Sequence, residues 1–193
     1  MRVVRVVRYA VAALPLLFAA TSAPAHVGHD VTGFVSGFVH PLGGLDHILA
    51  MVAIGLWAGQ LGGRALWAVP VSFVAAMVLG GILGMAGQPL HATELAIAVS
   101  VVVLGLVVAL RLRPQLLLAV AVSGAVAVFH GHAHGIEAGA TTDGVSYALG
   151  FVAATGLLHL TGIAASELCR VAAARAAVPL AGALIACIGM VLV

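Results

Sequence analysis

Charged residues are scarce in this chain of 193 residues, and lysine is absent altogether. Only 7% of the residues are charged and 63% are hydrophobic, whereas a typical soluble domain carries about 25% charged residues. So few charges cannot form a water-facing surface, which excludes a soluble enzyme, a nucleic-acid-binding protein and a disordered chain. The composition therefore indicates an integral membrane protein.

The absence of lysine and of cysteine motifs excludes further kinds of membrane protein. Because there is no lysine, the Walker A sequence of ATP-hydrolysing proteins cannot occur, which argues against ATP hydrolysis by this chain. Cys169 and Cys187 form neither a CxxC motif nor a disulfide framework. The apolar stretches are long and continuous, so we expect an all-α, polytopic membrane helix bundle.

Residues 1–25 have the three parts of a secretory signal peptide. A basic region with Arg2, Arg5 and Arg8 precedes an apolar run of about 12 residues, which is short for a membrane span. Ala23-Pro24-Ala25 follows as a cleavage site of the Ala-x-Ala type. We predict cleavage after Ala25, which leaves residues 26–193 as a transmembrane domain whose N-terminus lies outside the cytoplasm.

Proline, glycine and charged residues divide the mature chain into six apolar segments. Most have roughly the 18–25 residues that cross a bilayer. The first predicted span is too long and too broken to be one plain helix, and we expect a break near His40, because Pro41 suits the first position of a helix. The six predicted spans are about Gly33–Gly62, Ala65–Ala86, Thr93–Leu110, Gln115–Gly135, Val145–Ser166 and Ala176–Val193.

The arginines orient these spans. With the N-terminus outside, the first, third and fifth connections lie inside, in agreement with the positive-inside rule. The C-terminus then also lies outside, so in a bacterium with two membranes both termini of this inner-membrane protein would be periplasmic. Those three connections hold all the arginines of the mature chain: Arg64, Arg111, Arg113, Arg170 and Arg175.

Histidine is unusually frequent, with nine residues against six aspartates and glutamates. In the predicted topology every histidine except His159 lies at or near the outer face. His159 lies deeper, toward the inner half of the fifth span. Ionisable side chains in a span are costly and mark an ion path, a relay or a binding site, so the histidines are the main functional signal.

The first histidine cluster runs from His40 to His47. In a continuous helix these two side chains would share a face about 10 Å apart along the axis, which is too far for one metal ion. A break at the intervening segment with Gly43 and Gly44 could shorten that distance and let Asp46 join, since broken helices are tolerated where they line a cavity.

The second cluster runs from Phe129 to Glu137. In a helix His130, His134 and Glu137 share one face, which is a plausible divalent-cation site, while His132 points elsewhere. Imidazole and carboxylate without thiolate suit Ni²⁺, Co²⁺, Zn²⁺ or Cu²⁺ rather than Mg²⁺ or Ca²⁺. The carboxylate could instead orient a histidine, and proton relay is the competing use of the same residues.

Several other residues are weaker candidates. His26 and His29 would form an outer capture site on the mature N-terminal tail. The glycines at 80, 81 and 84 are typical of a helix-packing surface. The remaining weaker metal candidates are Glu94, His132 and His159.

Both motifs resemble those of the HupE/UreJ family of bacterial membrane proteins, and the resemblance covers the whole chain. The family's His-x5-Asp-His motif is matched by His40, Asp46 and His47. Its Phe-His-Gly-x-[Ala/Val]-His-Gly-x-Glu motif is matched from Phe129 to Glu137, with His132 at the variable position.

The resemblance implies a nickel permease without a prosthetic group. It implies secondary transport of Ni²⁺ or Co²⁺ across the inner membrane for hydrogenase or urease maturation, with the motif histidines and acids essential to uptake. Nickel chaperones would be the downstream partners. The preference for nickel rests on the resemblance, because ligand type does not separate Ni²⁺, Co²⁺ and Zn²⁺.

Two other classes could use the same side chains. An intramembrane zinc hydrolase would hold Zn²⁺ on the histidines and use Asp46 or Glu137 as a base. A haem-binding electron carrier would use histidines on facing helices as axial ligands. A metal sensor is less suited, because the chain has no soluble domain to receive a signal.

Overall fold

The described part of the chain is entirely helical in its regular structure. The computed structural model describes residues 33–138, 143–172 and 174–193. The predicted signal peptide, His26 and His29 lie outside these residues. Within them the helices are α2 (Phe34–Gly43), α3 (Leu45–Leu61), α4 (Ala65–Met85), α5 (Thr93–Ala109), α6 (Leu116–Ala138), α7 (Gly144–Val171) and α8 (Ala177–Leu192).

The helix lengths support a multi-pass membrane protein. Three apolar helices, α4, α6 and α7, are each long enough to cross a bilayer, and α2 with α3 passes as a fourth, broken span. The other two, α5 and α8, have 17 and 16 residues, somewhat less than the ~20 of a typical span. The all-α prediction is confirmed, whereas the prediction of six spans is supported by length for three or four.

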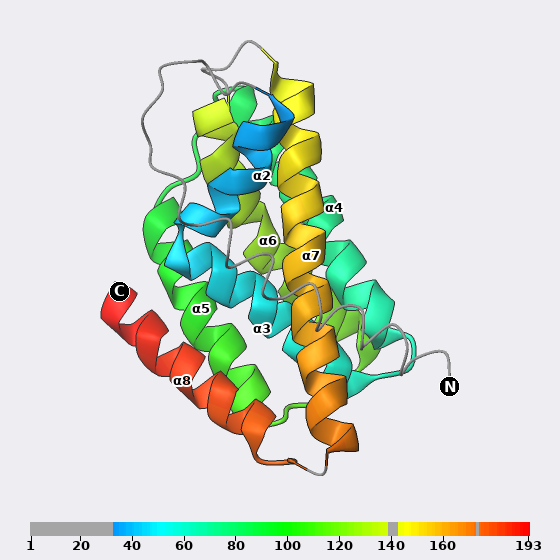
Figure 1. Ribbon diagram of the computed structural model, residues 1–193. Helices are drawn as coiled ribbons and strands as arrows, with labels where there is room; N and C mark the ends of the chain where they lie inside the picture. Colours follow the sequence, from blue (N-terminus) through cyan, green and yellow to red (C-terminus); the bar gives the residue numbers. More distant parts are fainter. Residues whose placement is uncertain (1–32, 139–142, 173) are drawn as a thin grey trace.

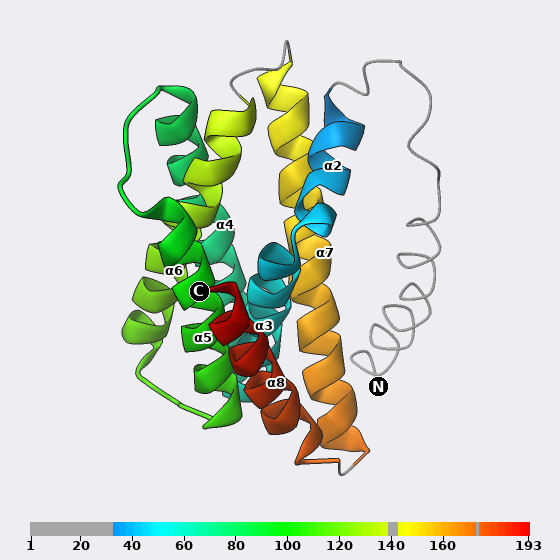
Figure 2. The ribbon, with the colours of Figure 1, turned by 90° about the vertical axis from the view of Figure 1, so that its left-hand side faces the viewer.

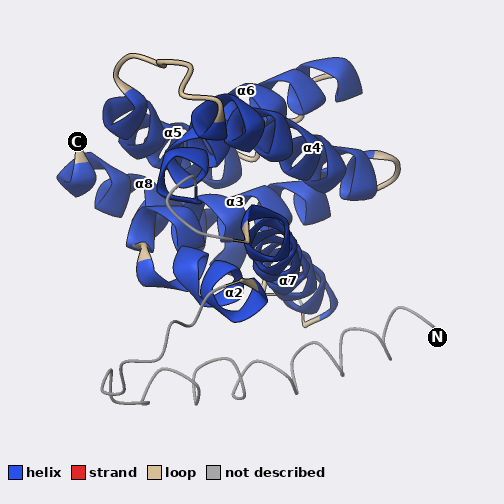
Figure 3. Cartoon of the chain, turned by 90° about the horizontal axis from the view of Figure 1, so that it is seen from above, coloured by secondary structure: helices blue, strands red, loops and turns tan. Residues whose placement is uncertain are grey.

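The long helices α4, α6 and α7 run along the bundle, and α3 lies across its middle (Figures 1 and 2). Seen from above, α3 lies between α2 and α7 on one side and α4, α5 and α6 on the other (Figure 3). From residue 53 to residue 59 every side chain of α3 is buried, as expected for a helix that is apolar on all sides. This helix is therefore the centre of the core.

The first predicted span is broken at Gly44. There α2 and α3 meet at an angle of 89°. Gly44 has an extended backbone, and a Cβ at this position would lie 2.8 Å from the Asp46 carboxylate, so a side chain would displace that group. The predicted break in the first span is confirmed, but it lies one turn after His40, at the glycine segment, because Pro41 is accommodated inside the last turn of α2.

Glycines allow the helices to approach closely. A Cβ on Gly131 or Gly135 of α6 would collide with the backbone carbonyl of Met77 or Gly81 on α4. From the other side, Gly80 and Gly84 of α4 face the α6 backbone equally closely. The predicted packing role of the α4 glycines is therefore confirmed, and α6 stays continuous through the histidine motif.

The arginine-rich connections gather at one end of the bundle. Near this end, the side chains of Trp57 and Gln60 on α3 donate to the carbonyls of Leu112 and Val108, both at 3.0 Å. The guanidinium of Arg111 donates to the backbone carbonyl of Arg175, which joins the α5–α6 and α7–α8 connections. Figure 2 shows the α5–α6 and α7–α8 connections at the lower end of the bundle, and Arg64 of the α3–α4 connection lines a pocket there with Arg113. The predicted clustering of the arginines on one side is thus seen in the fold.

At the opposite end α7 begins at a capped turn. The Asp143 carboxylate accepts the Ser146 backbone N–H at 3.1 Å. Hydrogen bonds from the side chain and backbone of Ser146 hold the pKa of the exposed Asp143 carboxyl below its ordinary value. This cap satisfies one of the backbone donors that every helix leaves free at its N-terminus.

We predict that Gly131→Ala destabilises the folded protein by about 1–3 kcal/mol, because the added methyl group must displace α4. Gly156→Ala is the matched control, since nothing lies within 4 Å of its added Cβ. In a helix this control should be neutral or stabilising by about 0.5–1 kcal/mol. Thermal unfolding of the purified proteins in detergent measures the stability of both variants. Equal stability of Gly131→Ala and Gly156→Ala would contradict the packing role of Gly131.

Candidate metal site

Four histidines from three helices lie together in the half of the bundle opposite the arginines. His134 of α6 is in ring contact with His40 at the end of α2 and with His47 at the start of α3, with centroids 4.8 and 4.3 Å apart. His47 also contacts His130, one turn earlier on α6, at 4.8 Å. We call His40, His47, His130 and His134 the histidine cluster.

The bend at Gly44 makes this cluster possible. It turns α3 away from the direction of α2, so that His40 and His47 reach the same partner, His134. On α6 the spacing of four residues puts His130 and His134 on one face. The structure thus brings the histidines of the two sequence motifs together.

Asp46 orients His47. One oxygen of its carboxylate accepts the Nδ1–H of His47 at 2.7 Å and the backbone N–H of His47 at 2.8 Å. The proton of the neutral ring is therefore on Nδ1, and Nε2 carries the lone pair. That Nε2 is buried and has no hydrogen-bond partner among the described residues, so it is available to a ligand.

Ser100 of α5 orients His130 in the same way. Its hydroxyl donates to the Ile97 carbonyl at 2.7 Å and lies 2.9 Å from Nε2 of His130. A hydroxyl has one proton, so with that proton on Ile97 it accepts the Nε2–H of His130. The lone pair is then on Nδ1, which is buried and unpartnered within the described residues. Sequence reasoning missed Ser100, although a hydroxyl inside an apolar helix was a usable signal.

Aromatic side chains surround the cluster. Tyr147 and Phe151 of α7 lie against His40 and His134, at 5.8 and 4.2 Å between centroids. Phe73 of α4 lies 5.9 Å from His130. These three residues were not identified from the sequence. Their rarity was a usable signal, because aromatic residues make up only 5% of the chain. They exclude water, which strengthens any interaction between a cation and the imidazole lone pairs.

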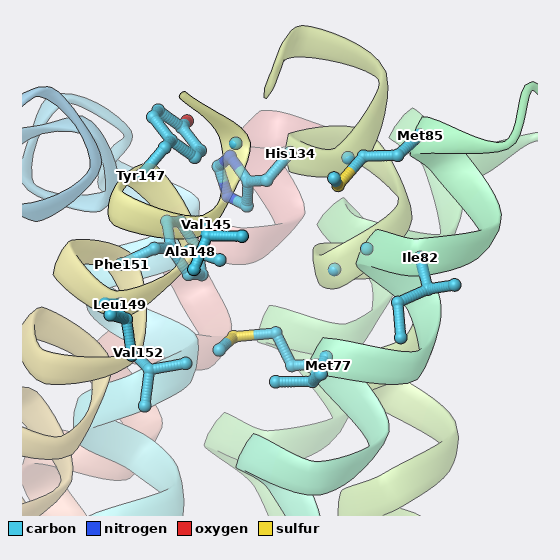
Figure 4. A pocket seen from close by; sticks show the side chains of 15 residues that line it. Met77, Ile82, Met85, His134, Val145, Tyr147, Ala148, Leu149, Phe151 and Val152 are labelled. Atoms are coloured by element: carbon cyan, nitrogen blue, oxygen red, sulfur yellow. The ribbon is translucent and has the colours of Figure 1, made fainter. Parts of the chain in front are cut away.

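A pocket of about 470 Å³ extends from the cluster along the bundle between α4, α6 and α7. Its lining is almost wholly apolar. Figure 4 shows His134 and Tyr147 at one end and Met77 and Val152 toward the other. The pocket therefore connects the cluster with residues deeper in the bundle.

The weaker candidates lie apart from the cluster. His132 is buried and its Nε2–H donates to the Gln88 carbonyl at 2.7 Å, so it anchors the α4–α5 connection. Glu94 is exposed in the first turn of α5, and His159 is buried deeper along α7. Glu137 is in the last turn of α6, but its side chain lies outside the described part of the structure.

The arrangement is a series of partial sites rather than a closed cage. Among the described residues, no three His, Cys, Asp or Glu side chains are grouped so that they could hold one metal ion. The imidazoles instead meet edge to face, and His47 and His130 each present a single lone pair. A structural metal site would bring four ligands together, whereas a transport path needs weaker sites that also release the ion.

Comparisons with known proteins agree with the two motifs. Residues 14–192 match the family model described as HupE / UreJ protein. The chain is also 44% identical over 146 residues to Protein HupE of Rhizobium leguminosarum bv. viciae, and the match covers 76% of each chain. No solved structure matches the chain significantly.

We predict that Ser100→Ala weakens Ni²⁺ binding by the purified protein about 10-fold, the effect usual for loss of a residue that orients a metal-binding histidine. Ser72→Ala is the matched control, because the Ser72 hydroxyl bonds only to the Val69 carbonyl of its own helix. Equilibrium dialysis in detergent measures both affinities. Unchanged binding by Ser100→Ala would show that His130 does not depend on this serine.

Proposed function

Because the chain belongs to the HupE/UreJ family, we propose that it is a permease that imports Ni²⁺ across the bacterial inner membrane. The family consists of accessory transport proteins rather than enzymes, so the hydrolase alternative is set aside. Co²⁺ is the alternative cargo. The delivered ion would serve maturation of a hydrogenase or a urease, through nickel chaperones on the inner side.

The observation that carries this proposal is the convergence of both histidine motifs on one cluster, in which His40 is half-buried and the other three histidines are buried. The cluster lies in the half of the bundle opposite the arginine end, with His40 in the last turn of α2. If the arginines face the cytoplasm, as the positive-inside rule requires, the histidines face the periplasm together with both termini. An ion arriving from outside would then meet imidazole before it crosses the membrane.

Each side chain has a distinct role in this proposal. His40 and His134 form the outer contact, and His47 and His130 receive the ion next with lone pairs held in place by Asp46 and Ser100. The charge of Asp46, delivered through His47, offsets part of the cost of removing water from a divalent ion.

The outermost residues are assigned to capture. His26 and His29 would bind the ion first on the mature tail, and Glu94 and Glu137 would attract it to the mouth of the path. Their carboxylates and imidazoles suit Ni²⁺ and Co²⁺.

The driving force would be electrical and chemical rather than ATP. The membrane potential is worth about 2.3 kcal/mol per charge per 100 mV, and so about 4.6 kcal/mol for a divalent cation at that potential. Trapping of nickel by cytoplasmic partners would add to it. Weak, successive sites are suited to such a downhill process, because no single site holds the ion tightly.

We predict that cells lacking their own nickel transporters take up radioactive Ni²⁺ when they express this chain. His40→Ala, Asp46→Ala and His134→Ala should each lower the initial rate at least about 10-fold at matched membrane levels, because each removes a ligand or its orienting partner. His91→Ala is the control, since this histidine is exposed at the same end.

Competition with Co²⁺ and Zn²⁺ in the same assay defines the cargo. Background uptake by a correctly inserted parental protein would overturn the proposed function. Equal losses in His91→Ala and the cluster variants would show that the path does not run through the cluster.

A further inference from the structure

We infer that His159, Met77 and Thr155 form a second metal-binding station near the middle of the membrane, inward of the histidine cluster. We call these three residues the inner station. The inference rests on the proposed function, since it identifies where the ion goes after it leaves the cluster.

The first observation is that His159 is buried without a polar partner. Its side chain is 2% exposed, and neither ring nitrogen has a hydrogen-bond partner in the described part of the chain. By contrast, His47, His130 and His132 each use one nitrogen in a hydrogen bond. A buried polar group without a partner is costly, and a histidine kept only for packing would be expected to have one. Neither tautomer of His159 is fixed by a partner, so either nitrogen can carry the one lone pair of the neutral ring that would bind an ion.

The second observation is the position of His159 on α7. Tyr147, Phe151, Thr155 and His159 follow one another at four-residue intervals, so they lie along one face of the helix. The first two border the histidine cluster, which places His159 about 12 Å further along the axis than Phe151. It is near the midpoint of this 28-residue helix.

The third observation is the pairing of α7 with α4. The Thr155 hydroxyl donates to the sulfur of Met77 at 3.7 Å, and one turn further His159 meets the ring of Phe73 edge to face at 5.1 Å. Phe73 and Met77 are also one turn apart on their own helix. The four side chains therefore form two facing pairs, with His159 and Met77 on the diagonal.

Met77 links this group to the cluster. It lines the pocket that has His134 at its other end (Figure 4). Phe73 contacts both His130 and His159, so its ring separates the two groups of ligands. His159 lies beyond the pocket, against the far side of the Phe73 ring, so an ion moving inward from the cluster would meet the Met77 sulfur before the His159 ring.

The ligands of the inner station have a defined preference. An imidazole nitrogen and a thioether sulfur favour transition-metal ions such as Ni²⁺ and Co²⁺ over Mg²⁺ and Ca²⁺. Met77, Thr155 and Phe73 are all neutral, so the station would bind more weakly than a site with a carboxylate. Weak binding at this depth is what onward release to the cytoplasm requires.

The test is the dependence of the initial uptake rate on Ni²⁺ concentration in cells expressing His159→Phe, Met77→Leu or Thr155→Val. We expect the maximal rate to fall about 10-fold for His159→Phe and about threefold for Met77→Leu, with the half-saturating concentration within about twofold of the parental value. Met51→Leu is the matched control, because Met51 is a buried methionine, as Met77 is, but does not line the pocket.

Thermal unfolding of the same variants separates a transport role from a packing role. His159→Phe removes unpaired polar atoms and keeps a planar ring, so its melting temperature should equal or exceed the parental one. A lower maximal rate at an unchanged melting temperature supports the inner station. A reduced rate in Met77→Leu supports it even if His159→Phe is less stable.

Two results would overturn the inner station. One is a parental maximal rate in both His159→Phe and Met77→Leu. The other is a loss confined to a destabilised His159→Phe, with Met77→Leu and Thr155→Val at parental rates, which would assign His159 to packing. Absence of Ni²⁺ uptake by the parental protein would instead refute the proposed function itself, and the inference with it.

Discussion

The right-angled turn between α2 and α3 leaves backbone N–H groups at the start of α3 without partners in the helix, and a bilayer offers no water to bind them. One of these groups finds a partner locally, because the Asp46 carboxylate accepts the backbone N–H of His47 at the new helix start. The same oxygen accepts the ring Nδ1–H, so a single carboxylate stabilises the break and sets the tautomer of the imidazole beside it. Asp46 therefore serves both the fold, by accepting a backbone N–H at the start of α3, and the site, by orienting the His47 ring. Irregular backbone in a membrane is tolerated only where its polar groups find partners or line a cavity, and here the Asp46 carboxylate is such a partner.

The turn determines the rest of the architecture. It directs α3 across the bundle, where the other helices bury it, and it leaves α2 free to pack along α7. In the same way, the glycines of the second motif set the position of α6. Gly131 and Gly135 bring its backbone against α4, while His130 and His134 face the start of α3. Histidine and glycine thus alternate in this motif because they lie on two faces of α6. The glycine face packs against α4, and the histidine face forms the site.

Much of this could be predicted from the sequence, because hydropathy and charge are local properties. The helix boundaries of α4 and α5 lie within one residue of the predicted ones, and the arginine-rich connections share one end. The position of the break was misjudged because proline is tolerated in a last helical turn, whereas the sequence rule treats it as a start. Ser100, Tyr147 and Phe151 were not identified, since their importance arises from contacts with segments distant in the chain. A hydroxyl inside an apolar helix marks Ser100 as unusual, but no local pattern shows which distant residue it contacts.

The histidines differ in the hydrogen-bond partners of their ring nitrogens, and those of the cluster differ from the deeper His159. His47 and His130 each have one nitrogen fixed by a partner and one left open, so they present lone pairs in defined directions. His159, near the middle of α7, has no such partner in the described structure, and its neighbours Phe73, Met77 and Thr155 are neutral. An ion would therefore find its strongest electrostatic compensation beside Asp46 and progressively less toward the centre. The deeper site would therefore bind the ion more weakly than the histidine cluster does. For a carrier that moves an ion downhill, weak binding at the last site before release is an advantage. Beyond it, the membrane potential and the ligands of the cytoplasm act on the ion, and a tight site at mid-membrane would only slow its passage.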